Sequence, residues 1–177
     1  MSKTAQEHKL LAPSQLNFVI FICSTSRYSE LTQGKNVEDP SGVLIMQRLR
    51  DSGHIVLLRK ILSDSRVMIQ RNVKKALESE NVNAIITCGG TGISPRDVTI
   101  ESVKPLLEKE LDGFGEIFRR LSFDGIGSAA ILSRAIAGIS KGKVIFCIPG
   151  SPQAVSLCLE KLILPEVCHI LKHTREE

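Results

Sequence analysis

A glycine-rich segment between a buried strand and a helix is the part of the sequence best suited to chemistry. It reads Thr87-Cys-Gly-Gly-Thr-Gly-Ile-Ser-Pro-Arg-Asp97, with Gly89, Gly90, Thr91 and Gly92 at its centre. Three glycines within four residues remove side chains, so that backbone N–H groups can point at a bound anion. The segment therefore predicts a site for a phosphate or a carboxylate, although a tight turn without a ligand would use the same residues.

The spacing of these glycines differs from that of two common nucleotide-binding loops. A Rossmann GxGxxG motif that began at Gly90 would need its third glycine at position 95, where the chain has Pro95. A Walker A loop would need a Gly-Lys-Ser/Thr sequence, which this segment lacks. The sequence thus argues against an NAD-dependent dehydrogenase and against a P-loop enzyme.

Two aspartates accompany this segment, and each has a structural and a chemical interpretation. Asp97 ends the sequence Ser94-Pro-Arg-Asp97, which has the form of a helix-capping box, and Asp64 precedes a helical pattern that it could cap. A carboxylate beside an anion site is unfavourable unless a cation or a proton mediates. Two carboxylates, a phosphate loop and Mg²⁺ form a consistent set, so we predict Asp64 and Asp97 as catalytic residues and as Mg²⁺ ligands.

Further polar residues follow the ends of other strands. Gly150 and Ser151 open a helix whose free N–H groups suit an anion, although a plain turn would need no ligand. An arginine at position 134 usually marks a solvated face, but its planar guanidinium also suits an oxyanion. The predicted substrate-binding residues outside the glycine-rich segment are Ser24, Thr25, Ser133, Arg134, Gly150 and Ser151.

The elements that must position these residues alternate between strands and helices. Apolar runs predict strands over 17–23, 54–58 and 83–87, with the first followed by a polar turn at 24–27 and an irregular stretch to residue 40. Helical patterns lie between them: one is capped by Ser41 and stopped by Gly53, and the other follows 63–65. Strands that alternate with helices favour a parallel sheet with right-handed crossovers.

The second half of the chain continues this scheme. It predicts helices over 98–103 and 114–121, an antiparallel strand pair over 133–139 and 143–148, and a final helix from Pro152. The expected fold is an α/β three-layer sandwich, a mostly parallel, mixed sheet with helices on both faces. Ligands of such sheets bind at the carboxyl ends of the strands, so one crevice should collect four segments. These are 24–27, 63–65, 88–97 and 149–151.

Composition narrows the class of protein. The 177 residues predict a single domain over 16–172, with flexible tails over 1–15 and 173–177. A net charge of +4 and only 4% aromatic residues, with no Trp, argue against a nucleic-acid platform. No apolar run approaches the roughly 20 residues of a membrane span. The five cysteines lack CxxC spacing and are expected to be buried free thiols, so we expect a cytoplasmic protein.

With these residues in view, the sequence resembles the MoaB/MogA family of molybdenum cofactor biosynthesis proteins, which includes the G domain of gephyrin. The resemblance extends from Phe18 to about Leu171, and its middle part is most similar to MoaB. The matching stretches are Ile86-Thr-Cys-Gly-Gly-Thr-Gly-Ile-Ser-Pro-Arg-Asp-Val-Thr99, Glu110-Leu-Asp-Gly-Phe-Gly-Glu-Ile-Phe-Arg-Arg-Leu-Ser-Phe123, Ser133-Arg-Ala-Ile-Ala-Gly138 and Ile148-Pro-Gly-Ser151.

The resemblance implies an adenylyltransferase that moves AMP from Mg-ATP to the terminal phosphate of molybdopterin. It assigns the family's two functionally important aspartates to Asp97 and Asp64, although Ser63 and Ser65 flank the latter where the family usually has Pro-Asp followed by an acid. The polar residues named above would contact pterin or phosphate oxygens. The family also implies a homotrimer or homohexamer. A non-catalytic molybdopterin-binding or scaffolding protein of the same fold is the alternative, because some bacterial MoaB members bind the pterin without this transfer.

Overall fold

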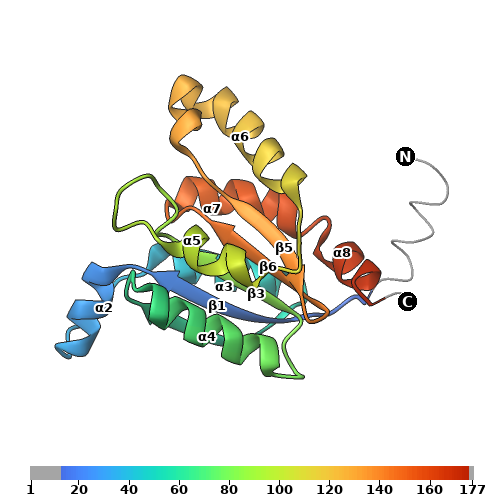
Figure 1. Cartoon of the computed structure of the whole chain (residues 1–177), viewed down its shortest axis with the longest axis horizontal. Helices are drawn as coiled ribbons and strands as arrows, with labels where there is room; N and C mark the ends of the chain where they lie inside the picture. Colours follow the sequence, from blue (N-terminus) through green and yellow to red (C-terminus); the bar gives the residue numbers. More distant parts are fainter. Residues whose placement is uncertain (1–12, 176–177) are drawn as a thin grey trace.

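A six-stranded mixed sheet forms the centre of the computed structural model, which describes residues 13–175 (Figure 1). The strand order is β2-β1-β3-β6-β5-β4; β1 is parallel to β2 and β3, and β6 is parallel to β3. β5 is antiparallel to both of its neighbours, β4 and β6. The short link between β5 and β6 had predicted an antiparallel arrangement for that pair. The strands are β1 (Asn17–Cys23), β2 (Ile55–Leu62), β3 (Ala84–Cys88), β4 (Lys109–Glu110), β5 (Ile136–Ser140) and β6 (Lys143–Ile148).

Helices cover both faces of this sheet. The α-helices are α2 (Thr25–Thr32), α3 (Pro40–Asp51), α4 (Arg66–Glu78), α5 (Thr99–Val103), α6 (Asp112–Ile126), α7 (Pro152–Cys158) and α8 (Val167–His173). Segments of 3₁₀-helix follow α5 and α6 over Lys104–Leu106 and Gly127–Leu132, and a π-helical turn follows α7 over Leu159–Ile163. Within residues 13–175, no helix combines the length and the apolar character that a membrane crossing needs.

The alternation of side chains along β1 explains the three layers. Phe18, Ile20 and Ile22 pack with α3, α6, α7 and α8 in one apolar core, whereas Val19 and Phe21 pack with α4 and α5 in the other. Successive side chains of a strand point to opposite faces of the sheet, so a run of apolar residues is stable only where both faces are covered. The predicted three-layer sandwich is confirmed.

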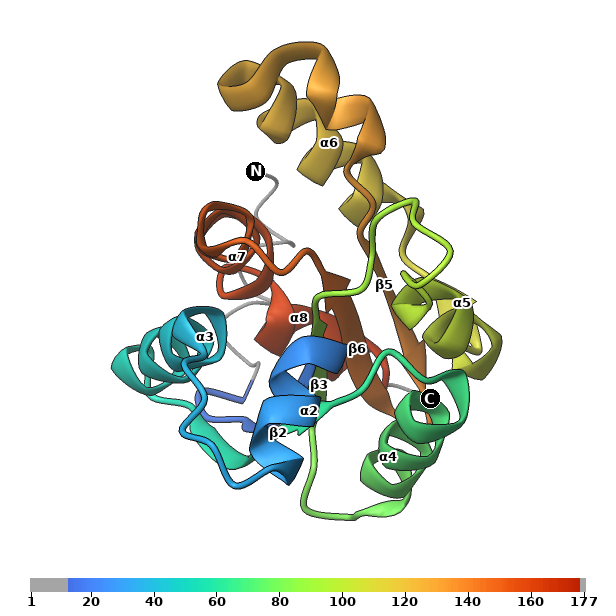
Figure 2. The same ribbon diagram turned by 90° about the vertical axis from the view of Figure 1, so that its left-hand side faces the viewer.

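Helix α2 differs from the prediction of a polar turn and an irregular stretch. None of its residues is buried, so the sequence carries no apolar period that could reveal it. Its start is fixed locally, because the Ser24 hydroxyl accepts the N–H of Arg27 at 3.5 Å. Ser24 is therefore the N-cap of a helix that projects from the carboxyl edge of the sheet (Figure 2).

The start of α3 was also predicted wrongly. Asp39, not Ser41, is the N-cap: its carboxylate accepts the Gly42 N–H at 2.8 Å, and Pro40 takes the first helical position. Ser41 lies inside the first turn instead. Its hydroxyl donates to the carbonyl of Gly150 at 2.7 Å, so it ties α3 to the carboxyl edge.

Three other boundaries differ for physical reasons. β2 continues to Leu62 because it is an edge strand whose polar residues Arg59 and Lys60 face solvent. The expected single helix after Ser151 is interrupted by the π-helical turn and by Pro165, which cannot donate a helical hydrogen bond. At the ends of the chain, the expected tail over 1–15 lies largely outside the described residues, and α8 extends to His173.

Candidate functional site

The four polar segments predicted to share one crevice do meet at the carboxyl edge of the sheet, which faces the viewer in Figure 2. Asp64 joins the loops that follow β1 and β2. The backbone N–H and the hydroxyl of Thr25 both donate to Oδ2 of Asp64, each at 2.8 Å. The N-terminus of α2 therefore stabilises this carboxylate, as the positive end of a helix does.

Gly89 joins the loops that follow β1, β3 and β6. Its φ of +96° is a left-handed conformation, and a Cβ atom there would lie 2.5 Å from the carbonyl oxygen of Cys23. Its N–H donates to the carbonyl of Ile148 at 3.0 Å, and a Cβ on Gly150 would lie 3.2 Å from the Gly89 Cα. Close backbone contact, which only glycine permits, brings these segments together.

The glycine-rich loop presents a row of unused backbone donors, which we name the amide cradle: the N–H groups of residues 90–93. Among the described residues, none of these four groups has a hydrogen-bond acceptor in the chain. Gly90 has a φ of +60°, a conformation common in anion-binding nests. Unpaired backbone donors are costly unless water or a ligand accepts from them, so the cradle suits a phosphate or a carboxylate.

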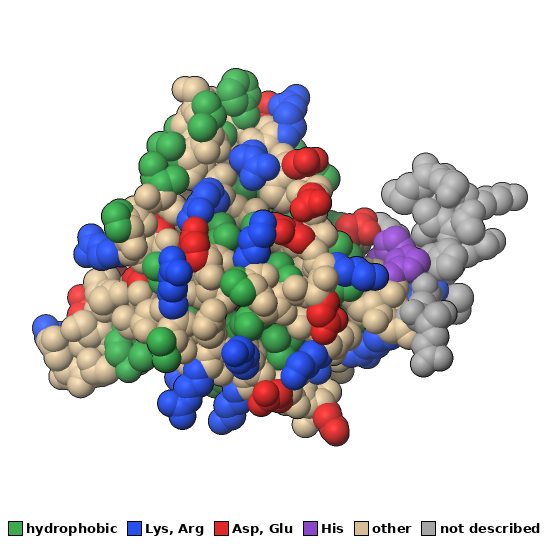
Figure 3. Space-filling view, viewed as in Figure 1, with side chains coloured by type: hydrophobic (Ala, Val, Ile, Leu, Met, Phe, Trp, Pro, Cys, Tyr) green, Lys and Arg blue, Asp and Glu red, His purple; other side chains and the backbone are tan. Residues whose placement is uncertain are grey.

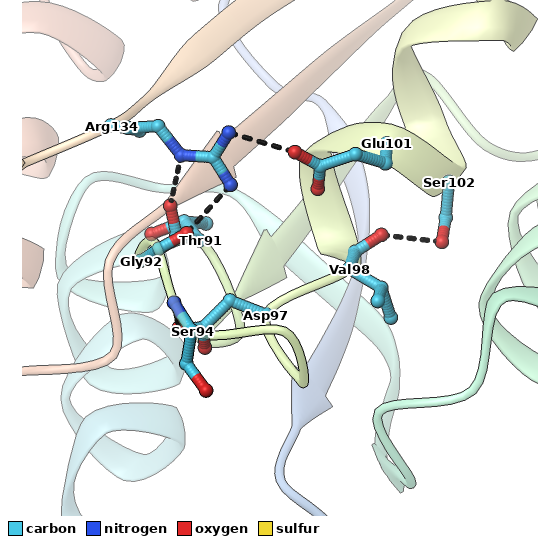
Figure 4. A network of polar contacts seen from close by, with 8 residues as sticks. All are labelled: Thr91, Gly92, Ser94, Asp97, Val98, Glu101, Ser102 and Arg134. Carbon is cyan, nitrogen blue, oxygen red and sulfur yellow. Dashed lines mark hydrogen bonds and ion pairs between the residues drawn. The ribbon is translucent and has the colours of Figure 1, made fainter.

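Arg134 holds the cradle in shape from behind (Figure 4). Its Nε donates to the carbonyl of Thr91 at 2.8 Å, and its Nη2 donates to the carbonyl of Gly92 at 2.6 Å. The N–H of a trans peptide points opposite to its C=O. The guanidinium therefore turns the N–H groups of Gly92 and Ile93 away from itself.

Glu101 on α5 holds Arg134 in place, since its Oε1 accepts from Nη1 of Arg134 at 2.7 Å. We call this ion pair, together with the bonds from Arg134 to the cradle, the clamp. Burial alone would raise the pKa of Glu101, but the hydrogen bond and charge of Arg134 outweigh burial and lower this pKa. A carboxyl whose pKa is lowered on folding stabilises the fold above its ordinary pKa and loses that effect as the pH falls through the lowered value. The clamp is therefore intact at neutral pH and weakens only in acid.

Asp97 closes the turn that follows the cradle. Its Oδ2 accepts the N–H of Ser94 at 2.9 Å, and its own N–H donates to the carbonyl of Ser94 at 2.8 Å. Half of the expected capping-box pattern is present, but it closes a turn, because helix α5 begins only at Thr99. The helix-cap interpretation of Asp97 is therefore wrong, and its Oδ1 has no partner among the described residues.

Asp64 is not a helix cap either. Ser65 caps α4, as its hydroxyl accepts the N–H of Met68 at 3.4 Å. Oδ1 of Asp64 and the hydroxyl of Thr99 are both buried without a hydrogen-bond partner, and both flank Gly90: a Cβ there would lie 2.8 and 2.6 Å from them. Carboxylate oxygens without a protein donor suit Mg²⁺, which commonly takes one or two carboxylates and completes its ligands with water and substrate phosphates. Asp64 and Asp97 each therefore offer an oxygen of the kind that suits this ion.

Several predicted site residues have structural partners. The hydroxyl of Ser151 caps α7 by accepting the Ala154 N–H at 3.3 Å, and the N–H of Ser133 donates to the carbonyl of Ala130 at 3.0 Å. Their hydroxyls still lie on the loops of this edge, so their predicted contacts with substrate stay predictions. The sequence did not reveal the roles of Ser41, Thr99 and Glu101 at this edge, because these roles depend on residues distant along the chain.

The cysteines match the expectation of free thiols. Cys23, Cys88, Cys147 and Cys158 are buried and Cys168 is half-buried. Burial raises the pKa of Cys23 to about 12 and also raises that of Cys88, whose thiol lies 3.5 Å from the carbonyl of Pro149. Reactive cysteines need an accessible thiolate, so Cys88 packs the end of its strand despite its place beside the cradle.

A backbone anion site next to two carboxylates, at the carboxyl edge of a parallel sheet, defines an α/β protein that handles phosphorylated substrates. Comparisons with known proteins make this class specific. Residues 20–169 match the family model of a "Probable molybdopterin binding domain". That range covers most of the chain and all four segments of the site.

This chain aligns with its relatives over nearly their whole length. The chain is 42% identical to "Molybdenum cofactor biosynthesis protein B" of Bacillus subtilis over 98% of this chain and 99% of that protein. It is 44% identical to a "Probable molybdopterin adenylyltransferase" of Methanocaldococcus jannaschii over 91% and 95%. A crystal structure of a molybdenum cofactor biosynthesis protein B superposes with a TM-score of 0.85 at 43% identity, covering 94% of this chain and 99% of that one. The chain belongs to the MoaB/MogA family of molybdenum cofactor biosynthesis proteins.

Proposed function

We propose that this protein is a molybdopterin adenylyltransferase, which transfers AMP from ATP to the terminal phosphate of molybdopterin. The observation that carries the proposal is the amide cradle beside Asp64: four unused N–H donors adjoin a carboxylate with one unpartnered oxygen. A site that only held a pterin phosphate would be weakened by that negative charge. A site that brings two phosphates together through a cation benefits from it.

The reaction needs positioning and charge neutralisation more than covalent help from side chains. An oxygen of the molybdopterin phosphate forms a bond to the α-phosphorus of ATP, and the bond from that phosphorus to the β-phosphate oxygen breaks, which releases pyrophosphate. The amide cradle would hold the molybdopterin phosphate. Donors fixed before the reaction stabilise charge without having to reorganise.

Asp64 and Asp97 would hold the Mg²⁺ that accompanies ATP. When bound, this ion supplies neutralisation of the phosphate charge. Thr25 orients the Asp64 carboxylate by donating twice to Oδ2, which leaves Oδ1 for a ligand. The Ser94 N–H orients Asp97 in the same way and leaves its Oδ1 unused.

Purified protein incubated with molybdopterin and Mg-ATP should release pyrophosphate and form an adduct with the mass of molybdopterin plus AMP. The alternative, a non-catalytic molybdopterin-binding or scaffolding protein, predicts tight pterin binding without either product. Omission of molybdopterin is the control, because simple ATP hydrolysis would continue without it. Pterin binding without adduct at saturating ATP would overturn the proposal.

Replacing Arg134 should impair the transfer through the shape of the cradle. Arg134→Gln leaves the carbonyls of Thr91 and Gly92 without their donors, so we expect kcat/KM for molybdopterin to fall about tenfold or more. Glu101→Gln is the matched variant, because it keeps an acceptor for Arg134 and removes only the charge; its effect should be smaller. Equal activity of Arg134→Gln and the wild-type protein would contradict this role.

We also propose that the protein assembles as a homotrimer or homohexamer through the arm formed by α6 and the following 3₁₀-helix. Phe114 and Phe118 anchor the first half of α6 in the core, whereas the far end of the arm stands away from the sheet in both ribbon views (Figures 1 and 2). The arm exposes Ile117, Phe123, Ile126, Ile131 and Leu132. Such an apolar surface usually marks contact with another chain. The double variant Phe123→Asp/Ile131→Asp should sediment as a monomer in analytical ultracentrifugation, whereas Val67→Asp, an exposed apolar residue on α4, should not change the assembly.

A further inference from the structure

A hollow lies between α2 and α4, and one of its lining residues, Ser65, directly follows Asp64 in the chain. It has a volume of about 470 Å³, and residues from both helices and from β2 line it. Tyr28 contributes an aromatic ring, Ser65 marks the end next to Asp64, and Lys60, Arg71 and Lys75 contribute three cations. No carboxylate lines this hollow.

None of the three cations of this hollow forms an ion pair with a carboxylate among the described residues. Lys60 donates to the side-chain oxygen of Asn72 at 3.1 Å, a neutral acceptor. Within residues 13–175, neither Arg71 nor Lys75 has an ion pair or a hydrogen bond from its side chain. In Figure 3, several Lys and Arg side chains lie over α4 at the lower edge of the face shown, with a few Asp or Glu side chains among them. Three uncompensated cations around one hollow create a field that attracts a multiply charged anion.

Asp64 lies at the boundary between the hollow and the amide cradle. Its Oδ2 accepts from Thr25 at the start of α2, one turn before Tyr28, and the next residue is Ser65 at the start of α4. Its Oδ1 faces the position of Gly90 in the cradle. A phosphate in the cradle and an anion in the hollow would therefore approach the same carboxylate from two sides.

We propose that this hollow binds the β- and γ-phosphates of the nucleoside triphosphate, while the cradle binds the molybdopterin phosphate; the assignment rests on the proposed adenylyl transfer. The charges match this division. The single phosphate of molybdopterin can be bound by backbone N–H donors. The triphosphate tail carries more negative charge and therefore needs cations. With its tail in the hollow, the α-phosphate would lie at Asp64, where the two substrates must meet.

The double variant Arg71→Gln/Lys75→Gln tests this assignment by binding, independently of turnover. Both residues are exposed, so the variant should fold as the wild type does. We expect its affinity for ATP with Mg²⁺, and for pyrophosphate, to fall about tenfold or more in calorimetry. Its affinity for molybdopterin should stay within a factor of about two. Lys74→Gln is the matched control, because Lys74 lies on the same helix but does not line this hollow.

The outcomes separate the two proposals. If the wild-type protein binds ATP but forms no adduct, and only the double variant loses ATP binding, adenylyl transfer fails and the hollow remains a nucleotide site. The assignment of the hollow is overturned if the double variant binds ATP like the wild type, or if it loses molybdopterin instead. It is also overturned if Lys74→Gln weakens ATP binding equally, since general positive charge would then explain the effect, or if the wild-type protein binds no ATP.

Discussion

Asp97→Asn is expected to lower the rate of adenylyl transfer about a hundredfold or more while the fold stays intact. The amide oxygen of asparagine can still accept the Ser94 N–H, which Asp97 accepts at 2.9 Å, so the turn after the cradle should persist. What the substitution removes is the negative charge. If Asp97 holds Mg²⁺ against the phosphates, that charge matters most in the transition state, so kcat should fall more than affinity for molybdopterin.

The measurement is pyrophosphate release at saturating molybdopterin and Mg-ATP, with thermal unfolding as a check on the fold. Asp51→Asn is the matched control: Asp51 is exposed at the C-terminal end of α3, outside both the site and the proposed assembly surface. Its loss should leave turnover unchanged. Normal turnover by Asp97→Asn would remove Asp97 from the mechanism, and equal damage by the control would point to a nonspecific effect of charge.

The sheet and its two cores could be predicted because their signal is local. The run from Asn17 to Cys23 contains enough apolar residues to fill both faces of a strand, and the structure buries it on both faces. The glycine-rich loop was also evident, since three glycines after a buried strand predict either an anion site or a tight turn. Its exact conformation was not, because it depends on the carbonyl of Cys23 and on Arg134, which are distant in sequence.

The sequence did not predict helix α2 or the turn at Asp97, because both depend on single hydrogen bonds and not on a periodic pattern of apolar residues. Helix α2 buries no residue, so nothing in its pattern distinguishes it from a loop. The capping sequence from Ser94 to Asp97 predicts the start of a helix, but its hydrogen bond closes a turn, and α5 begins only at Thr99. Capping motifs report local hydrogen bonds, and the surrounding packing decides which element contains them.

Gly90→Ala should inactivate the protein almost as completely as loss of an aspartate. A Cβ at this position would lie 2.6 Å from the Thr99 hydroxyl and 2.8 Å from Oδ1 of Asp64, closer than real Cβ atoms come to such neighbours. The methyl group would therefore displace the carboxylate that faces the cradle and would occupy the space beside it. We expect adenylyl transfer to fall about a hundredfold, because a misplaced carboxylate can no longer orient the phosphates.

Backbone strain must be separated from this displacement, since Gly90 has a φ of +60°. Gly142→Ala is the matched control: Gly142 has a φ of +67°, and a Cβ there would meet nothing within 4 Å. Both variants should lose about 1–2 kcal/mol of stability to the left-handed conformation, but only Gly90→Ala should lose activity. If Gly142→Ala were equally inactive, strain alone would account for the loss; if Gly90→Ala kept full activity, neither Oδ1 of Asp64 nor the space beside Gly90 would serve the reaction.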